Sequence, residues 1–527
     1  MTNPISDIEK ADVILVAGSN TTETHPVISS AIKRAVKFGG KQLIVLDPRK
    51  ITLKQHATLS MSPNPGSDIA WINGMIRVIL EEGLEAKEYI DERTEGFDAL
   101  KEAVAPFTPA YVEELTGIPA EKLIRAALLY AGGESGTILY CMGITQHTKG
   151  TDNVKALANL AMVCGNLGIE GGGVNPLRGQ NNVQGACDMG GLPDVYSGYR
   201  KVHEEAHALT IEKAWGTQGL SRKTGLTATE MVDEALKGAL KALYIIGENP
   251  LVSEADLNHT EKGFNNLEFL VVQDIFMTET AQAADVVLPA LCFAEKEGTF
   301  TNTERRVQRV RKAVDGPEGV PTDWEITCEI ARRMGADMGY DSSEAIFDEI
   351  TSVTPTLGGL SYERLEKGGI PWPCPTADHP GTPRLHVGQF AKGKGTFFPI
   401  AFTPAAETPD ADYPLTLTTG RVLYHYHTGT MTRKSDGLNQ QVSECFVEMN
   451  REDAKAQNLA HGDMATIFSR RGKIKAKVNI SGRMNKGTVF LPFHFAEAAA
   501  NRLTNAKLDP VSKIPEFKVC AVTVVKA

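Results

Sequence analysis

Long apolar runs are missing from this chain of 527 residues, because no stretch approaches the about 18 consecutive apolar side chains that span a bilayer. The first seven residues, Met1 to Asp7, also have neither the basic segment nor the apolar core of a secretion signal. Positive charge is scarce as well, since 55 Lys and Arg stand against 65 Asp and Glu. A net charge of −10 is unsuited to a phosphate backbone. We therefore expect no membrane span and no nucleic-acid partner.

Closely spaced cysteines are absent too. No two of the eight cysteines form a C-x₂₋₄-C pair, so we expect neither a zinc ribbon nor a ferredoxin-type cluster in this chain. Scattered single cysteines in a large chain are typical of reduced, buried thiols, which predicts a cytoplasmic protein. The eight are Cys141, Cys164, Cys187, Cys292, Cys328, Cys374, Cys445 and Cys520.

What the sequence does contain begins with an alternation of strand and helix. Residues 12–18 form a short apolar run that ends in glycine, which predicts a buried parallel strand. Residues 25–39 predict an amphipathic helix that opens with Pro26, and residues 43–47 predict the next strand. A right-handed crossover makes the two strands parallel.

A second unit of the same kind follows near residue 242. Residues 243–247 repeat the strand that ends at Gly18, and residues 270–274 repeat the strand that ends at Asp47. From glycine to aspartate the interval is 29 residues in the first unit (18 to 47) and 27 in the second (247 to 274). We interpret this pseudo-repeat as two Rossmann-like α/β lobes with parallel sheets.

The periodicity changes after a stretch rich in Pro, Gly and Lys at 369–404, which predicts a connector. Strand-like segments then follow at 414–419, 464–469, 473–480 and 487–492, separated by turn signals. These predict a C-terminal β-barrel. The expected domains are a first α/β domain at 1–180, a second at 181–385, a connector at 386–404 and a barrel at 405–527.

Polar residues stand where the two lobes would bind a ligand. In an open α/β sheet, ligands bind beyond the carboxyl ends of the strands, which are here Gly18-Ser-Asn20 and Gly247-Glu-Asn249. The carboxylates of Asp47 and Asp274 could accept hydrogen bonds from a ribose or from guanine. Neither site has the G-x-G-x-x-G fingerprint, and each of these residues could equally be a turn or cap residue. The duplication favours two similar nucleotides, one per lobe.

The segment 175–190 is dense in amides and glycines and contains one arginine, Arg178. Ordering such a loop requires partners for its amides, and a buried guanidinium requires an anion such as a carboxylate. The alternative is a surface loop with a solvated arginine. The apolar stretches around it place the loop between domains, so we favour a functional role.

A third polar cluster lies at 418–421 and 424–430. His425 and His427 alternate, so on a strand they would share a face, and two metal ligands are conceivable. No third ligand stands nearby. Structural histidines, or histidines that bond a cofactor's phosphates, are the favoured interpretation.

These segments together resemble a known family. The run from Arg178 to Gly190 closely resembles catalytic subunits of formate dehydrogenases in the molybdopterin oxidoreductase superfamily, and so do 142–146, 273–278 and 297–306. The resemblance continues through Tyr426-His427-Thr-Gly-Thr to 513–521, so it covers nearly the whole chain.

The resemblance implies two molybdopterin guanine dinucleotides around one Mo or W, which would account for the duplicated lobes. One dinucleotide is expected on Asn20, Asp47, Arg49, Gly66 and Asp68. The other is expected on Gly247, Glu248, Asn249, Gln273, Asp274 and Thr278. The pterins and phosphates are expected to be lined by Met142, Gly143, Gln146, Gln180, Asn181, Arg421, His427 and Asn501.

The resemblance also implies the reaction, which is reversible oxidation of formate to CO₂ by hydride transfer to the Mo or W centre. Arg178 aligns with the family's substrate arginine, whose guanidinium can clamp and orient the formate carboxylate. Electrons would leave through an iron–sulfur cluster to iron–sulfur subunits, with ferredoxin, an NAD-reducing module or a hydrogenase as the acceptor.

The sequence departs from the family at its start. Family members begin with a cysteine motif for a [4Fe–4S] cluster, then a lysine, then a Cys or selenocysteine metal ligand followed by His, and none of these is present. We expect the missing N-terminal part of the same subunit to carry them and, as a hypothesis, a selenocysteine codon read as a stop just upstream of Met1. The chain alone is then expected to be inactive.

Two alternatives stay open. One is another molybdopterin oxidoreductase, such as a nitrate reductase or the large subunit of a respiratory complex, against which the Arg178 loop argues. The other is a non-catalytic scaffold subunit with a degenerate site, against which the retention of both nucleotide lobes argues.

Overall fold

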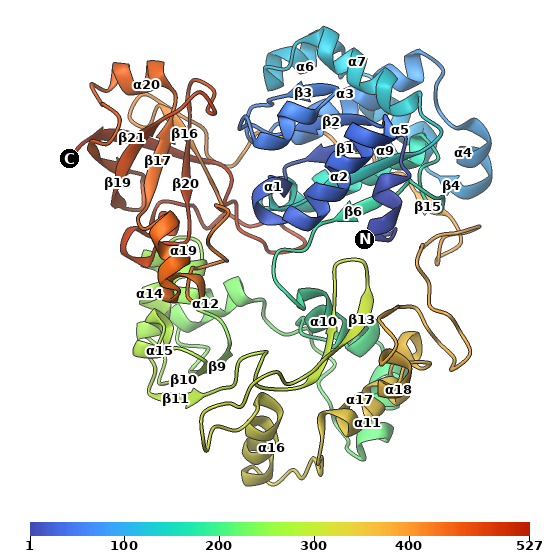
Figure 1. Ribbon diagram of the computed structural model, residues 1–527, viewed down its shortest axis with the longest axis vertical. Helices are drawn as coiled ribbons and strands as arrows, with labels where there is room; N and C mark the ends of the chain where they lie inside the picture. Colours follow the sequence, from blue (N-terminus) through green and yellow to red (C-terminus); the bar gives the residue numbers. More distant parts are fainter. The chain divides into compact units, whose positions relative to one another are not determined.

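The computed structural model describes all 527 residues, and the chain forms two compact units (Figure 1). The first unit comprises Met1–Leu177, Leu251–Glu261 and Arg384–Ala527, and the second comprises Arg178–Pro250 and Lys262–Pro383. The first unit thus contains both the amino-terminal lobe and the carboxyl-terminal segment. The domain limits expected at residues 180, 385 and 405 stay a prediction.

The first unit is built on a five-stranded parallel sheet with the strand order β3-β2-β1-β5-β6. The strands predicted at 12–18 and 43–47, and their parallel pairing, are confirmed. Every residue of the two central strands β1 and β5 is buried, as apolar runs in a doubly covered parallel sheet should be. The strands are β1 (Val13–Ala17), β2 (Gln42–Leu46), β3 (Leu59–Met61), β5 (Gly136–Tyr140) and β6 (Val174–Pro176).

One face of this sheet is covered by the predicted helix, α2 (Pro26–Gly39). It opens with proline at its first turn, where no amide hydrogen is needed, and it is capped by Gly40, whose φ of 65° is in the left-handed region. Because side chains alternate along a strand, Ile14 and Val16 point into the core with α2. Ile28 and Ile32 of the helix meet them there.

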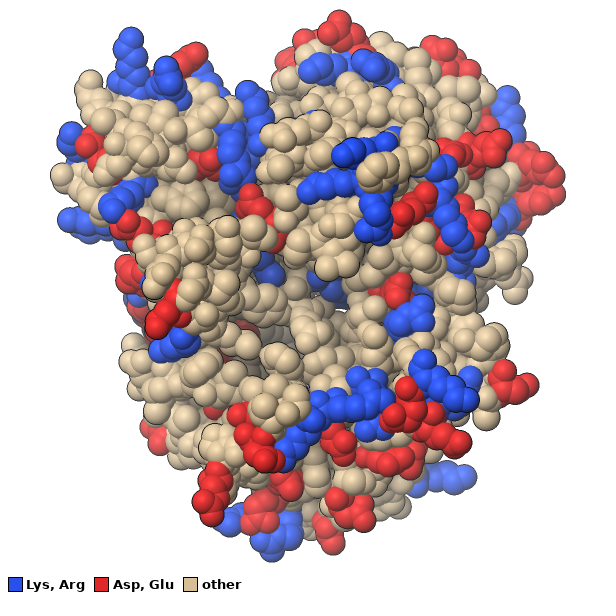
Figure 2. Space-filling view, in the orientation of Figure 1, with Lys and Arg blue, Asp and Glu red and all other residues tan.

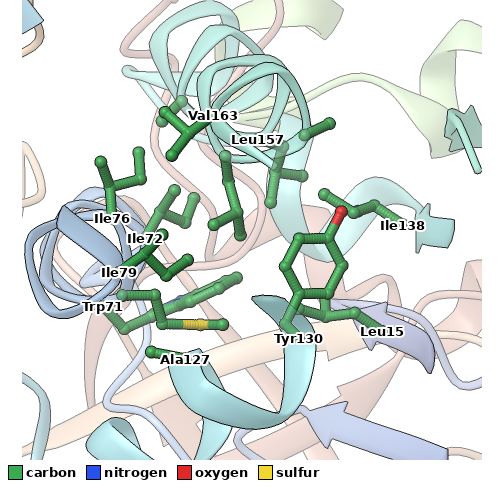
Figure 3. Close-up of a cluster of buried hydrophobic side chains, with 14 of the residues drawn as sticks. Leu15, Trp71, Ile72, Ile76, Ile79, Ala127, Tyr130, Ile138, Leu157 and Val163 are labelled. Atoms are coloured by element: carbon green, nitrogen blue, oxygen red, sulfur yellow. The ribbon is translucent and has the colours of Figure 1, made fainter. Parts of the chain in front are cut away.

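The opposite face packs against α3 (Asp68–Glu81), α7 (Ala120–Ala131) and α9 (Gly150–Val163). Figure 3 shows Trp71 and Ile72 of α3 among side chains from the other two helices and from β1 and β5. Trp71 is fully buried, so α3 is anchored at its first turn. That first turn also begins with Asp68, one of the predicted site residues. Shorter helices around this core are α4 (Lys87–Arg93), α5 (Phe97–Val104) and α6 (Pro109–Thr116).

The predicted connector packs closely against this lobe. Its strand β15 (Gly395–Thr396) pairs with β4 (Thr94–Glu95), and its Phe397 and Ile400 are buried in the core beneath α3. Asn73 donates through Nδ2 to the carbonyl of Ile400 at 2.8 Å. The segment is therefore ordered by backbone pairing and apolar burial, although most of it lacks regular structure.

The carboxyl-terminal segment forms a closed six-stranded barrel with the order β16-β20-β17-β19-β18-β21. The four predicted strands are confirmed, and two more, β17 and β21, were not predicted. The alternation of Lys473–Ile480 matches its observed burial, because every second residue points into the barrel core. The strands are β16 (Leu415–Gly420), β17 (Phe446–Met449), β18 (Met464–Phe468), β19 (Lys473–Ile480), β20 (Thr488–Pro492) and β21 (Cys520–Lys526).

The second unit contains the second predicted α/β lobe. β9 (Ala242–Ile246), β10 (Phe269–Asp274) and β11 (Val286–Pro289) pair in parallel in the order β11-β10-β9, which confirms the predicted parallel pair. Leu270 and Val272 are buried on one face of the sheet. On the other face Ile246 is 51% exposed and Phe269 46% exposed, which is unusual for a parallel sheet.

An antiparallel sheet and several helices complete the second unit. β13 lies between β12 and β14, and a small core gathers around Phe347, Leu357 and Tyr362. The elements are α10 (Val183–Asp188), α11 (Glu205–Trp215), α12 (Ala228–Leu236), β12 (Gly298–Thr301), β13 (Arg306–Val310), α16 (Asp323–Arg333), α17 (Ser343–Val353) and β14 (Ile370–Pro371).

Figure 2 shows Lys and Arg interspersed with Asp and Glu over the face drawn, so neither sign of charge dominates it. None of the helices combines the length and the apolar character needed to cross a membrane.

Candidate functional site

The candidate site of the first unit lies at the carboxyl ends of β1 and β5. These two strands are neighbours, although β2 and β3 lie on one side of β1 and β6 on the far side of β5, so the strand order reverses there. Such a reversal opens a crevice for ligands in α/β sheets. Gly18 follows β1, and Gly143 lies in the short helix α8 (Met142–Thr145) after β5. The amide of Gly143 donates to the carbonyl of Gly18 at 3.0 Å.

This approach of two backbones depends on glycine at both positions. A Cβ on Gly143 would lie 2.6 Å from the Cα and O of Gly18, and a Cβ on Gly18 would lie 2.7 Å from the carbonyl carbon of Gly143. The φ of Gly18, +55°, also favours glycine. Met142 and Gly143 of the predicted set are thus placed directly against the loop that carries Asn20.

Buried polar atoms without partners mark the same loop. Ser19 Oγ, Thr21 Oγ1 and both amide atoms of Asn20 are buried and hydrogen-bond to nothing. Leaving one such group unpaired costs about 1–3 kcal/mol, so a run of four at one strand end fits a polar ligand that satisfies them. Asn20 was predicted to bind a nucleotide, and its two neighbours were not.

The structure confirms the pseudo-repeat at the level of single hydrogen bonds. The amide of Gly18 donates to the carbonyl of Leu46 at 3.0 Å, and the amide of Gly247 donates to that of Gln273 at 2.8 Å. Asp47 accepts the amide of Arg49 at 2.8 Å, and Asp274 accepts that of Phe276 at 3.1 Å. Both carboxylates therefore end a strand in the same local turn, each with its second oxygen unused by that bond.

Burial raises the pKa of Asp47, and nearby cations, Lys54 first among them, oppose that rise. Lys54 donates to the carbonyl of Asp47 at 2.7 Å and to Ser62 Oγ at 2.6 Å. Burial lowers the pKa of Lys54 to about 8. In the second unit, burial likewise raises the pKa of Asp274.

The barrel side of this site gathers buried positive charge. Lys518 Nζ donates to the carbonyl of Thr419 at 2.8 Å, and burial lowers its pKa to about 8. The Arg421 guanidinium, just beyond β16, makes no hydrogen bond or ion pair and lies 5.5 Å from the ring of Tyr426. Burial lowers the pKa of Arg421 as well. Cations that are buried without carboxylates fit an anionic group such as a phosphate.

Arg49 lies between the lobe and the barrel. Its guanidinium donates to Glu448 at 2.7 Å and lies 3.5 Å from the centre of the Phe490 ring, and its Nε has no partner. The predicted nucleotide-binding arginine is thus already paired with a buried carboxylate. Glu448 also accepts Ser481 Oγ at 2.8 Å.

A buried histidine joins three parts of this unit. His147 Nε2 hydrogen-bonds the carbonyl of Gly143 at 2.9 Å and lies 3.8 Å from the carboxylate of Asp68. His147 Nδ1 lies 3.9 Å from Glu516 of the barrel segment. Burial lowers the pKa of His147, but the two carboxylates outweigh it and the net shift is upward. Gly66, with φ +82°, lines the small pocket beside this histidine together with Glu516.

His425 and His427 do not lie on a strand, because both follow β16 in irregular structure, so the shared strand face considered for them does not occur. His425 is buried and hydrogen-bonds the carbonyl of Val442 at 2.6 Å, so its role is structural. Burial lowers the pKa of His427 to about 4, and its carbonyl accepts a hydrogen bond from His494 Nδ1. No group of three or more His, Cys, Asp or Glu able to hold a metal ion occurs anywhere in the 527 residues.

Two more predicted residues of the first unit have side-chain polar atoms without a hydrogen-bond partner. Asn501 donates through Nδ2 to the carbonyls of Val252 and Ser253, at 3.1 and 2.9 Å, while its buried Oδ1 has no partner. Gln146 ends α8, where its amide donates to the carbonyl of Met142 at 3.0 Å. Its side chain makes no hydrogen bond.

In the second unit the predicted side chains hydrogen-bond to other residues of the same unit. Asn249 accepts Thr280 Oγ1 at 2.7 Å and donates to Glu279 at 2.7 Å, in contrast to the unpartnered Asn20 of the first lobe. Thr278 caps the short helix α15 (Glu279–Gln282), and Gln273 donates to Asp323 at 2.7 Å. Gly247 and Glu248 precede Asn249 in the turn after β9.

Arg178 stands at the start of the second unit, where Gln180 and Asn181 follow it in the turn before α10. Its amide donates to Thr303 Oγ1 at 3.1 Å, and its Nε donates to Gln184 Oε1 at 3.3 Å. The loop is thus ordered by side-chain bonds, as its amide content predicts. Gln184 was not singled out, nor was Asp188, to which it is bonded.

Sequence reasoning also missed Lys54, Lys518 and His147. Lys518 lies within the segment 513–521 that carried the family resemblance, so that motif could have indicated it. Lys54 and His147 are single residues outside any spacing pattern, and only the fold brings them to the strand ends.

Comparison with known proteins identifies the family. A family model described as Molybdopterin oxidoreductase matches residues 1–333, and one described as Molydopterin dinucleotide binding domain matches 415–521. The chain belongs to the molybdopterin oxidoreductase family.

Its relatives include enzymes with different substrates in their names. The chain is 52% identical over 528 residues to the F420-dependent formate dehydrogenase subunit alpha of Methanocaldococcus jannaschii, with 99% of this chain and 78% of the relative covered. It is 38% identical over 539 residues to the assimilatory nitrate reductase catalytic subunit of Bacillus subtilis, with 100% and 76% covered. The structure of acetylene hydratase from Pelobacter acetylenicus is similar in fold, with a TM-score of 0.79, 19% identity, and 99% and 81% covered.

Proposed function

We propose that this chain supplies the cofactor-binding residues and the substrate arginine of a formate dehydrogenase catalytic subunit, which works with two molybdopterin guanine dinucleotides and one Mo or W. The observation that carries the cofactor is the buried, unpartnered polar edge formed by Ser19, Asn20 and Thr21 beside the Gly18–Gly143 contact. Formate as the substrate is supported by the 52% identity to a formate dehydrogenase subunit over 528 residues.

The residues fit such a cofactor by their chemistry. The unpartnered amide of Asn20 and the strand-end carboxylate of Asp47 offer donors and acceptors to a nucleoside, and Lys518 and Arg421 offer positive charge to phosphates. The first nucleotide is proposed on Asn20, Asp47, Arg49, Gly66 and Asp68. The second is proposed on Gly247, Glu248, Asn249, Gln273, Asp274 and Thr278. The pterins and phosphates are proposed on Met142, Gly143, Gln146, Gln180, Asn181, Arg421, His427 and Asn501.

The reaction is HCOO⁻ → CO₂ + H⁺ + 2e⁻. When bound, the metal cofactor supplies the acceptor for the two electrons. Arg178 binds and orients the substrate, because its guanidinium is a planar, permanently charged fork that matches a carboxylate. Charge neutralisation and orientation by this one side chain are its contribution to the rate.

The electrons then leave to other subunits, which we infer from the relative's name, since a subunit alpha has partners. That name adds F420 to the acceptors considered above, beside ferredoxin, an NAD-reducing module and a hydrogenase. An iron–sulfur cluster as the exit from the metal centre is part of this proposal.

Nitrate reduction is the second candidate, favoured by the 38% identity to a nitrate reductase. Nitrate and formate are both small planar anions with one negative charge. An arginine that binds the anion therefore does not by itself discriminate between them. Discrimination must come from the other residues around the substrate.

A substrate panel on the cofactor-loaded enzyme tests the proposal. Formate should reduce an artificial electron acceptor, and nitrate should not oxidise a reduced dye. Turnover of nitrate without any turnover of formate would replace the proposal with the second candidate.

A further inference from the structure

The guanidinium of Arg178 is held by a glutamine six residues further along the chain, Gln184. Arg178 Nε donates to Gln184 Oε1 at 3.3 Å, while the backbone amide of Arg178 donates to Thr303 Oγ1 at 3.1 Å. The first contact fixes the rotation of the guanidinium plane, and the second fixes the backbone from which the side chain extends. Gln184 lies in the first turn of α10 and is buried.

The amide of Gln184 can face only one way. Its Nε2 donates to Asp188 Oδ1 at 2.8 Å and lies 3.1 Å from Tyr199 Oη, so the amide nitrogen points to the carboxylate. The oxygen must then point to Arg178. A flipped amide would place its oxygen against the carboxylate and its NH₂ group against the guanidinium, so both contacts would become repulsive.

Asp188 is the anchor of this arrangement. The carboxylate accepts three hydrogen bonds, from Gln184, from Tyr199 Oη at 2.8 Å and from Trp372 Nε1 at 2.7 Å, and the residue is 3% exposed. Burial raises the pKa of Asp188, and these bonds and the charge of Arg178 oppose that rise. Three donors on one buried carboxylate fix the orientation of its plane. They therefore also fix the Gln184 amide that is hydrogen-bonded to it.

The outer members are themselves held in place. Tyr199 has a φ of 62°, a left-handed conformation that a non-glycine residue adopts at an energetic cost. Arg305 hydrogen-bonds the carbonyl of Trp372 and the carbonyl of Pro383, and its guanidinium lies 5.4 Å from the Trp372 ring. The strained tyrosine and the clamped tryptophan both direct a polar hydrogen at Asp188.

We propose that Gln184, Asp188, Tyr199 and Trp372 are positioning residues that hold the Arg178 guanidinium in one orientation for a planar substrate anion. This inference rests on the proposed function, in which that anion is formate. None of the four is a catalytic residue, since each acts through Arg178. We call this hydrogen-bonded network the arginine brace; it connects Arg178 through Gln184 to Asp188, and Asp188 to Tyr199 and Trp372.

The test uses the cofactor-loaded enzyme with Gln184→Met, which keeps the length of the side chain and removes its acceptor. Arg178 then loses the hydrogen bond to Gln184 Oε1, so the KM for formate should rise about tenfold, equivalent to about 1.4 kcal/mol of binding. The kcat should change less than the KM. A purely structural role would lower the melting temperature and the active fraction, and so kcat, while leaving the KM unchanged.

A matched pair of tyrosine variants guards against general destabilisation. Tyr199→Phe removes one donor to Asp188, and Tyr362→Phe removes a hydroxyl that donates to Ser343 at 3.1 Å in the same unit, away from the brace. We expect a KM increase of about threefold, a fraction of one hydrogen bond, only for Tyr199→Phe. An unchanged KM in both Gln184→Met and Tyr199→Phe overturns the brace while formate oxidation stands. A wild-type enzyme without formate oxidation overturns the proposed function and the brace with it.

Discussion

Asn20 and Asn73 are two asparagines of the same lobe whose amide groups are buried in different surroundings. Asn73 donates to the carbonyl of Ile400, whereas neither amide atom of Asn20 has a partner. The amide nitrogen of Asn73 is thus bonded inside the protein, where it stabilises the fold, although its Oδ1 has no partner. A side chain that is left wholly unpaired destabilises the empty protein and gains its bonds only with a ligand. The contrast separates binding from stability at single positions.

Asn20→Ala is therefore expected to reduce the guanine nucleotide that copurifies with the chain, without lowering the melting temperature of the nucleotide-free protein. Asn73→Ala is the control, and it should lower stability by about 1 kcal/mol while nucleotide content stays constant. Nucleotide release on denaturation and thermal unfolding measure the two effects. Equal nucleotide content in Asn20→Ala and wild type would remove Asn20 from the site.

Arg178→Lys replaces the planar fork by a point charge, which keeps the sign of charge and loses the paired donors. Loss of one or two charge-assisted hydrogen bonds should lower kcat/KM for formate about 100-fold, while the melting temperature changes little. Steady-state kinetics on the loaded enzyme check this. A kcat/KM within twofold of wild type would show that Arg178 does not clamp the substrate.

His147 predicts a pH dependence of stability. Its pKa in the folded chain is above 6.5, since Glu516 and Asp68 outweigh the opposing effect of burial. The stabilisation from protonated His147 is thus fully present below about pH 6.5 and is lost as the pH rises through the folded pKa. His147→Gln should flatten this loss in urea unfolding between pH 6 and 9. The exposed His203→Gln is the control, and identical slopes in wild type and His147→Gln would contradict the assignment.

At the scale of elements, the site is made by the turn after β1 and the short helix α8 after β5. Gly143→Ala would press a Cβ onto the backbone of Gly18, which cannot yield as a flexible side chain can. We expect the free energy of unfolding to fall by about 1–3 kcal/mol and nucleotide binding to weaken. Gly437→Ala, in α19 (Asp436–Gln441), has no atom within 4 Å of the added Cβ and serves as the control. If both variants behave alike, the close approach of the two turns is not needed.

The regular elements were predictable because their signals are local. The apolar runs at β1, β2, β9 and β10, and the Pro26 and Gly40 limits of α2, each depend on a few neighbouring residues. The conformation of 424–427 could not be assigned from the sequence, because alternating histidines occur both on strands and outside them. The arginine brace could not be predicted, because Trp372 comes to Asp188 from 184 residues away in the chain.

At the scale of the whole chain, each unit has one lobe with the same strand-end turn, but the two lobes differ in how complete they are. The first lobe has a five-stranded sheet and unpartnered polar atoms at its strand ends. The second has three strands, an exposed apolar face, and strand-end side chains that already hydrogen-bond to neighbouring side chains. The first lobe is therefore the better-formed of the two proposed nucleotide sites, and the barrel contributes Lys518 and Arg421 to the same region.

The central claim is that this chain holds two guanine dinucleotides and one metal, and its most direct test is the composition of the purified enzyme. Acid release of guanine nucleotide and elemental analysis should give two guanine nucleotides and one Mo or W per chain. An enzyme that contains neither guanine nucleotide nor Mo or W would contradict the account.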